Sequence, residues 1–169
     1  MSLITLKDLS LARSAPLFAG LDLGIAKGHR LGLVAANGRG KSSLLRILAG
    51  TEEASGGTLT RSRGLVTAFA PQDPPERLLP MSLYDAVLDA LDAEAAETES
   101  WRVDVLLDDL MVEESLRSRV VGSLSGGWQR TMLLARAVVI EPDLLLLDEP
   151  TTHLDLERIG LLERFLANL

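Results

Sequence analysis

The stretch Arg30-Leu31-Gly32-Leu33-Val34-Ala35, with Asn37-Gly38-Arg39-Gly40-Lys41-Ser42-Ser43 soon after it, decides the fold of this chain. The first six residues are mostly apolar and predict the first strand of a buried sheet. Gly38 and Gly40 mark a tight loop. A helix should follow through Leu44, Leu45, Ile47 and Leu48 and end at Gly50. Strand, glycine-rich loop and helix in this order indicate an α/β protein.

The loop carries the residue types that bind phosphate groups. Gly38 and Gly40 let the backbone approach a phosphate, Lys41 can reach β- and γ-phosphates, and Ser42 can bind Mg²⁺. The strict motif has a glycine where this chain has Ala35, which adds one methyl group without requiring a loss of binding. The alternative is an ordinary glycine turn with a surface lysine, which the flanking strand and helix disfavour.

Two carboxylates follow a second apolar run, Leu144-Leu145-Leu146-Leu147. Such a run predicts a buried parallel strand, and ligands of open α/β sheets lie at the carboxyl ends of the strands. We expect Asp148 to hold Mg²⁺ through water and Glu149 to orient or deprotonate an attacking water. Gln72, between a strand and a proline-rich turn, is a candidate for the same metal or water. The alternatives are a helix N-terminus or a solvated acid pair for the two carboxylates, and a solvated loop glutamine for Gln72.

The remaining chain predicts two further subdomains. Residues 3–11 and 21–25 alternate apolar and polar residues, and residues 58–70 hold two more strand-like stretches, so we expect an antiparallel β-subdomain. Residues 82–116 have helical spacing, with the acidic residues 92–99 as a solvated linker. Residues 151–155 predict a loop, and residues 156–166 predict the last helix.

Composition excludes several classes of protein. The chain has 169 residues, no cysteine and a net charge of −7, which disfavours a disulfide framework and a broad electrostatic grip on nucleic acid. No signal peptide and no run of about 20 apolar residues is present, so we expect no direct membrane insertion.

A third motif, Leu124-Ser125-Gly126-Gly127, places small residues and a hydroxyl at a predicted helix start, where backbone N–H groups favour an anion. The chain resembles the nucleotide-binding domain of an ABC ATPase along nearly its whole length. The resemblance rests on the order of its motifs, which is the phosphate loop, Pro71-Gln72, Leu124–Gly127, Leu147–Pro150 and His153-Leu154-Asp155. The resemblance implies an α/β fold: a phosphate-loop core sheet, an antiparallel β-subdomain and a small helical subdomain. We expect one domain, with the core and β-subdomain in residues 1–72, the helical subdomain in 73–123, and the signature helix, second motif strand, loop and last helix in 124–169.

The resemblance also implies ATP hydrolysis with Mg²⁺. The implied catalytic residues are Glu149, Gln72 and Lys41, and the implied metal-binding residues are Ser42, Asp148 and Gln72. The implied nucleotide-binding residues are Asn37, Gly38, Arg39, Gly40, Lys41, Ser42, Ser43 and, by stacking on the base, Arg13, where many members have an aromatic residue. Ser125, Gly126 and Gly127 should bind the γ-phosphate held by a second cassette. That partner is either a continuation of the same chain or a second copy.

Trp128 after the signature, His153 in the following loop and Pro16-Leu17-Phe18 are similar to F-type ABC proteins, although that family usually has asparagine in place of Thr152. F-type proteins lack membrane domains and commonly act on ribosomes, so the resemblance implies a cytoplasmic protein with the ribosome as a candidate partner. Only 52 residues separate Gln72 from Ser125, which leaves little room for the arm that reaches into the ribosome. The alternative is the ATPase subunit of a membrane transporter. A chromosome-maintenance ATPase would need a coiled coil that this interval excludes.

The family pattern continues with one more core strand and a histidine that contacts the γ-phosphate, and neither His29 nor His153 fits that position. That strand lies between the two motif strands in related sheets. We therefore expect a fragment that stops before the final core strand and has weak or absent hydrolysis by itself. A module that uses ATP only to hold two cassettes together is a further alternative.

Overall fold

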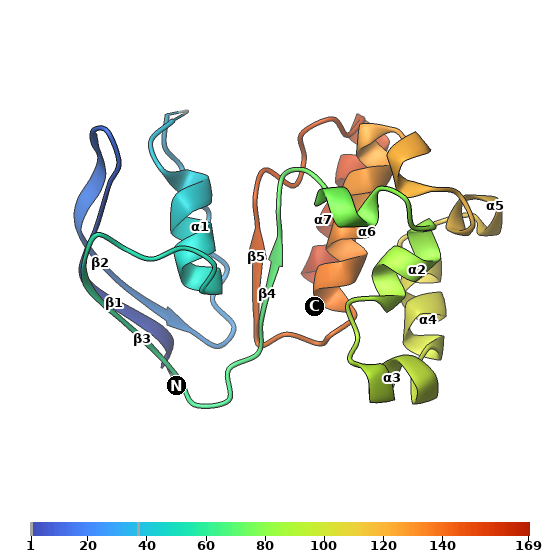
Figure 1. Ribbon diagram of the computed structural model, residues 1–169, viewed down its shortest axis with the longest axis horizontal. Helices are drawn as coiled ribbons and strands as arrows, with labels where there is room; N and C mark the ends of the chain where they lie inside the picture. Colours follow the sequence, from blue (N-terminus) through green and yellow to red (C-terminus); the bar gives the residue numbers. More distant parts are fainter. Residues whose placement is uncertain (1, 37) are drawn as a thin grey trace. The chain divides into compact units, whose positions relative to one another are not determined.

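The computed structural model describes residues 2–36 and 38–169, which divide into two compact units (Figure 1). The first unit runs to Phe69 and takes in Pro142–Asp148. The second unit consists of Ala70–Glu141 and Glu149–Leu169. The chain therefore passes between units three times, once directly after Asp148.

An antiparallel sheet in the order β2-β1-β3 forms one layer of the first unit, as predicted. Its strands are β1 (Ser2–Ala12), β2 (Pro16–Ala26) and β3 (Gly56–Arg61). The register shifts between Leu6 and Leu9, and Asp8 at this shift has a φ of 49°. Such an extra residue reverses the alternation of faces, so β1 buries four apolar residues on one side: Ile4, Leu6, Leu9 and Leu11.

Helix α1 (Lys41–Ala49) packs against this sheet through Leu44, Ile47 and Leu48, which recur at the spacing of one helical face. The helix ends at Gly50, whose left-handed backbone donates N–H bonds to the last turn, as predicted. Arg61 also donates from Nη2 to the carbonyls of Ile47 at 2.8 Å and Leu48 at 3.2 Å. Backbone carbonyls at the end of the helix thus have hydrogen-bond partners.

A second sheet pairs β4 (Thr67–Ala70) with β5 (Leu144–Leu147), two segments far apart in the sequence (Figure 1). Leu146 of β5 joins the same apolar cluster as α1 and β1. Just before β5, Asp143 accepts from the Val66 amide at 3.0 Å and donates its own amide to the Val66 carbonyl at 2.9 Å. The predicted strand before the two carboxylates is present.

The prediction of a strand at Arg30–Ala35 is wrong for this structure. These residues have no regular secondary structure, and the side chains of Leu31, Leu33 and Val34 are 58%, 45% and 94% exposed. An extended segment becomes a strand only when a neighbour satisfies its N–H and C=O groups, and no described strand pairs with this one. Apolar composition alone did not bury it.

The second unit is helical. Its helices are α2 (Leu83–Leu88), α3 (Ala93–Thr98), α4 (Trp101–Asp109), α5 (Glu114–Arg117), α6 (Gly126–Val138) and α7 (Leu156–Ala167), with short 3₁₀ turns at Glu76–Leu78 and Val121–Ser123. Helices α2 and α4 both contact α6. None of the helices among residues 2–36 and 38–169 has the length and apolar character needed to cross a membrane.

The acidic segment 92–99 is a helix rather than the expected linker. Asp92 accepts a hydrogen bond from the Ala95 amide at 2.9 Å and so caps the start of α3. No residue of α3 is fully buried, which agrees with the predicted solvation. The local cap therefore organises a segment that has no apolar face of its own.

Candidate functional site

The glycine-rich loop leads into the start of α1 in the first unit. Gly38 and Gly40 have φ values of 76° and 85°, a left-handed conformation that favours glycine. A methyl group on Gly40 would also lie 3.2 Å from Leu17 and from Phe18, so the Pro16-Leu17-Phe18 segment supports the loop. Arg39 is exposed between the two glycines. Asn37, a predicted nucleotide-binding residue, lies outside the described residues.

Among the described residues, no side-chain capping hydrogen bond is found at Gly40, the N-cap residue of α1. The first N–H groups of a helix have no partner within the helix, and together with the helix dipole they favour an anion. The Lys41 ammonium donates to the Ala35 carbonyl at 2.8 Å, so its charge lies back over the loop. Ser42 is half-buried beside it. These features suit a phosphate with an associated cation.

Arg13 contacts α1 and the turn after it rather than standing alone. Its guanidinium lies 2.9 Å from a Glu52 carboxylate oxygen and donates to the hydroxyl of buried Ser43 at 3.4 Å. The Arg13 side chain remains 59% exposed. The base-stacking role stays a prediction.

The two predicted acidic residues occupy different units. Asp148 follows β5 directly, is only 4% exposed and belongs to the first unit. Because α1 and β5 contact each other, Ser42 and Asp148 lie at the ends of adjoining elements. Among the described residues no three His, Cys, Asp or Glu side chains converge to hold a metal. The Ser42 hydroxyl and the Asp148 carboxylate suit Mg²⁺, because this ion keeps several water ligands and needs few from the protein.

Glu149 begins the second unit in a strained turn. Its φ is 47°, unusual for a residue with a Cβ, and its side chain is exposed. The Thr152 hydroxyl donates to the Glu149 carboxylate at 3.3 Å, and the Thr152 amide donates to the Glu149 carbonyl at 3.2 Å. Gln72 lies half-buried in the bend after β4, in the same unit.

The signature residues lie at the start of the thirteen-residue helix α6. Ser125 is the N-cap residue, but its hydroxyl makes no capping hydrogen bond. Methyl groups on Gly126 and Gly127 would each lie 3.4 Å from His153, at its Cβ and its carbonyl oxygen respectively. The loop at His153 therefore packs closely against the signature, and an uncommitted hydroxyl stands beside uncapped N–H groups.

Two arginines in this region were not among the predicted residues. The Arg158 guanidinium lies 3.5 Å from the centre of the Trp128 ring, a cation–π contact between α7 and α6. Arg130 is 7% exposed and donates from Nη1 to the Glu149 carbonyl at 3.2 Å. An arginine at an otherwise buried position of an apolar helix face is the sequence signal that could have identified Arg130.

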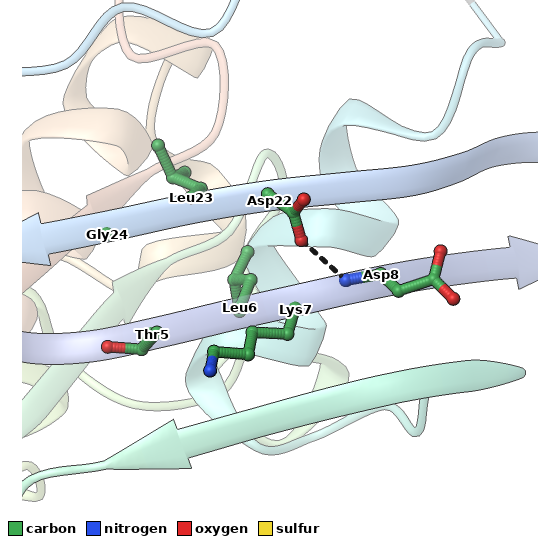
Figure 2. Close-up of a pocket in the computed structure, with 7 residues that line it drawn as sticks. All are labelled: Thr5, Leu6, Lys7, Asp8, Asp22, Leu23 and Gly24. Atoms are coloured by element: carbon green, nitrogen blue, oxygen red, sulfur yellow. Dashed lines mark hydrogen bonds between the residues drawn. The ribbon is translucent and has the colours of Figure 1, made fainter.

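A separate depression lies over β1 and β2 and shares none of the predicted residues. It is lined by Thr5, Leu6, Lys7, Asp8, Asp22, Leu23 and Gly24 (Figure 2). Within it the Asp22 carboxylate accepts from the Asp8 amide at 2.7 Å, a bond drawn in the figure. That bond stabilises the bulge of β1, so we assign the depression a structural role.

Comparisons with known proteins agree with these motifs. The family model described as "ABC transporter" matches residues 18–152. The ATP-binding protein Uup of Haemophilus influenzae is 34% identical over 201 residues, covering 99% of this chain and 31% of that protein. Elongation factor 3 of Phytophthora infestans is 35% identical over 147 residues, covering 87% of this chain and 14% of that protein.

A solved dimeric ATP-binding cassette, bound to ADP and Pi in a post-hydrolysis state, superposes with a TM-score of 0.84 at 20% identity, covering 99% of this chain and 82% of that one. The predicted α/β fold is thereby confirmed. The chain spans less than a third of the length of the curated relatives described above.

Proposed function

This chain belongs to the ABC ATPase family, as predicted, and from that premise we propose that it binds and hydrolyses ATP as one cassette of a soluble F-type protein. One observation carries the proposal. The left-handed Gly40 turn before α1, the buried Asp148 and the Ser125 hydroxyl without a capping hydrogen bond occur together in the chain that has the family's motif order.

In this proposal, the loop from Asn37 to Ser43 and the Lys41 ammonium bind the phosphates of ATP. Ser42, Asp148 and Gln72 would hold Mg²⁺, directly or through water, and a bound Mg²⁺ would supply positive charge that offsets the charge of the phosphates. Glu149 accepts a proton from the attacking water as the water oxygen bonds to the γ-phosphorus. The bond to the bridging oxygen of the β-phosphate breaks, and ADP and Pi leave.

Ser125, Gly126 and Gly127 would bind the γ-phosphate held by a second cassette, because a helix start favours an anion and these residues do not face their own loop in the family. ATP would then hold two cassettes together, and hydrolysis would let them reopen. We propose a cytoplasmic location and a partner that this cycle remodels. The ribosome is the candidate, supported by Trp128, His153 and a relative named as an elongation factor. The second candidate is the ATPase subunit of a membrane transporter, the class that the matching family model names.

The test is an ATP titration of the Glu149→Gln variant with molecular mass as the readout. Removing the Glu149 carboxylate should stop hydrolysis and leave ATP binding intact. The molecular mass of the variant should therefore double at saturating ATP, while wild type turns ATP over. Glu163→Gln, an exposed acid on α7, is the matched control and should behave as wild type. Steady hydrolysis by the Glu149→Gln variant would contradict the catalytic assignment. An unchanged mass with bound ATP would contradict closure.

A further inference from the structure

Arg130 is a buried cation with an incomplete set of partners. Its side chain lies in α6, five residues after Ser125, and is 7% exposed. Nη1 donates to the Glu149 carbonyl at 3.2 Å, whereas Nη2 is buried with no hydrogen-bond partner among the described residues. Burying a charged group costs free energy unless its donors are satisfied. Stabilising the fold is therefore a poor explanation for this arginine.

The carbonyl that Arg130 contacts belongs to a residue with an unusual backbone conformation. Glu149 has a φ of 47°, a conformation that persists only where the surroundings enforce it. Its carbonyl accepts from both Arg130 and the Thr152 amide, and its carboxylate accepts from the Thr152 hydroxyl. The direction of the carboxylate depends on this backbone conformation.

From these contacts we propose that Arg130 is a positioning residue, which holds the Glu149 peptide in its left-handed turn and so aims the carboxylate for catalysis. The inference rests on the proposed function, because that proposal is what assigns Glu149 its catalytic role. Ser125 and Arg130 also lie on one helix. Helix α6 thus joins the residues proposed to contact the partner's nucleotide to the base of its own cassette.

A comparison of two arginine variants of α6 tests the proposal. Arg130→Met removes the bond to Glu149 and the unsatisfied N–H together. Its kcat should fall about tenfold or more, because small errors in the position of a reacting group are costly, while ATP affinity and the urea midpoint stay near wild type or the midpoint rises. Arg130→Lys keeps a donor of similar reach and should recover part of kcat.

Arg136→Met is the matched control, because Arg136 lies on the same helix and bonds to Ala86 and Asp89, away from Glu149. This variant should lower the urea midpoint and leave kcat of the folded protein unchanged. Hydrogen exchange at the Thr152 amide gives a readout that does not need turnover. It should speed up in Arg130→Met and stay unchanged in Arg136→Met.

Wild-type kcat together with wild-type exchange at Thr152 in Arg130→Met would overturn the positioning role. An equal loss of kcat and ATP affinity would also overturn it, because a residue that only aims the base does not bind substrate. If the wild-type chain does not bind ATP, the proposed function fails. Exchange at Thr152 then still decides whether Arg130 holds the turn.

Discussion

At the scale of single residues, one glycine allows β3 to cross closely over the bulge of β1. Gly57 has a φ of 85°, and a methyl group there would overlap the Asp8 carbonyl oxygen and lie 2.6 Å from Leu9 Cα. Gly56, its neighbour, has nothing within 4 Å of that position. The two adjacent glycines thus have different structural roles, which a sequence pattern alone does not distinguish.

Gly57→Ala should therefore destabilise the protein far more than Gly56→Ala. Left-handed strain of about 1 kcal/mol and overpacking of about 1–3 kcal/mol together give a loss of about 2–4 kcal/mol. Gly56→Ala should change stability by about 0.5 kcal/mol or less. Urea denaturation of both variants measures the difference. Equal losses would show that β1 moves aside without cost.

At the scale of elements, partly buried arginines connect the helices of the second unit through hydrogen bonds to backbone carbonyls. Arg136 of α6 bonds to the Ala86 carbonyl of α2 and lies 3.1 Å from the Asp89 carboxylate. Arg102 of α4 donates to the Val139 carbonyl at 2.6 Å. The last carbonyls of a helix lack partners within it, so these cations both satisfy helix ends and complement their dipoles.

The Asp89 contacts make stability depend on pH. Burial raises the pKa of this carboxyl, but hydrogen bonds from Arg77 and Arg136 outweigh it, and the net pKa lies below the usual range. A group with a lowered pKa in the folded state stabilises the fold at neutral pH, and that contribution disappears as pH falls through the folded pKa.

Asp89→Asn should thus lower the free energy of unfolding by about 1–3 kcal/mol at pH 7, the range for hydrogen bonds to charged groups. The difference in the free energy of unfolding between the variant and wild type should become smaller in acid, below about pH 4. Urea midpoints at several pH values test this, with the exposed Asp109→Asn as control. A gap that stays constant down to the acid limit would contradict the ionic origin.

At the scale of the whole molecule, the predicted site residues are divided between the two compact units. Lys41, Ser42 and Asp148 belong to the first unit, whereas Gln72, Ser125 and Glu149 belong to the second. The chain changes unit between the two adjacent acids. In the proposed function, Ser125 also binds the nucleotide of a second cassette, so the residues around one ATP come from two cassettes.

Mixing two inactive variants tests that division. Lys41→Ala should lose phosphate binding, and Ser125→Arg should block the signature. If two copies of the chain close on ATP, a mixed dimer has one site in which both Lys41 and Ser125 are intact. An equal mixture should then recover about a quarter of wild-type hydrolysis, since about half of the dimers are mixed and each has one of two sites. Each variant alone is the control, and no recovery would place Ser125 in the site of its own chain.

The sequence was most informative where structure depends on neighbouring residues. The alternation in β1 and the Gly50 end of α1 follow from side-chain period and glycine capping, which act within a few residues. The small residues after Ser125 likewise placed the start of α6. The motif order likewise predicted the family correctly. These features need no knowledge of distant contacts.

Sequence-based prediction was wrong, or gave no prediction, where contacts between distant segments determine the structure. Arg30–Ala35 has strand-like composition, yet without a paired neighbour its apolar side chains stay exposed. The contact of Arg130 with Glu149 and that of Arg158 with Trp128 join positions that no local pattern connects.

The sequence by itself thus determined most of the elements, the motifs and the family, because local period, glycine conformation and residue chemistry depend on adjacent positions. The tertiary structure alone decided which apolar segment is buried, which glycine cannot be replaced and which arginine reaches Glu149. Burial, close approach and hydrogen bonding depend on what packs against a residue, and that neighbour lies far away along the chain.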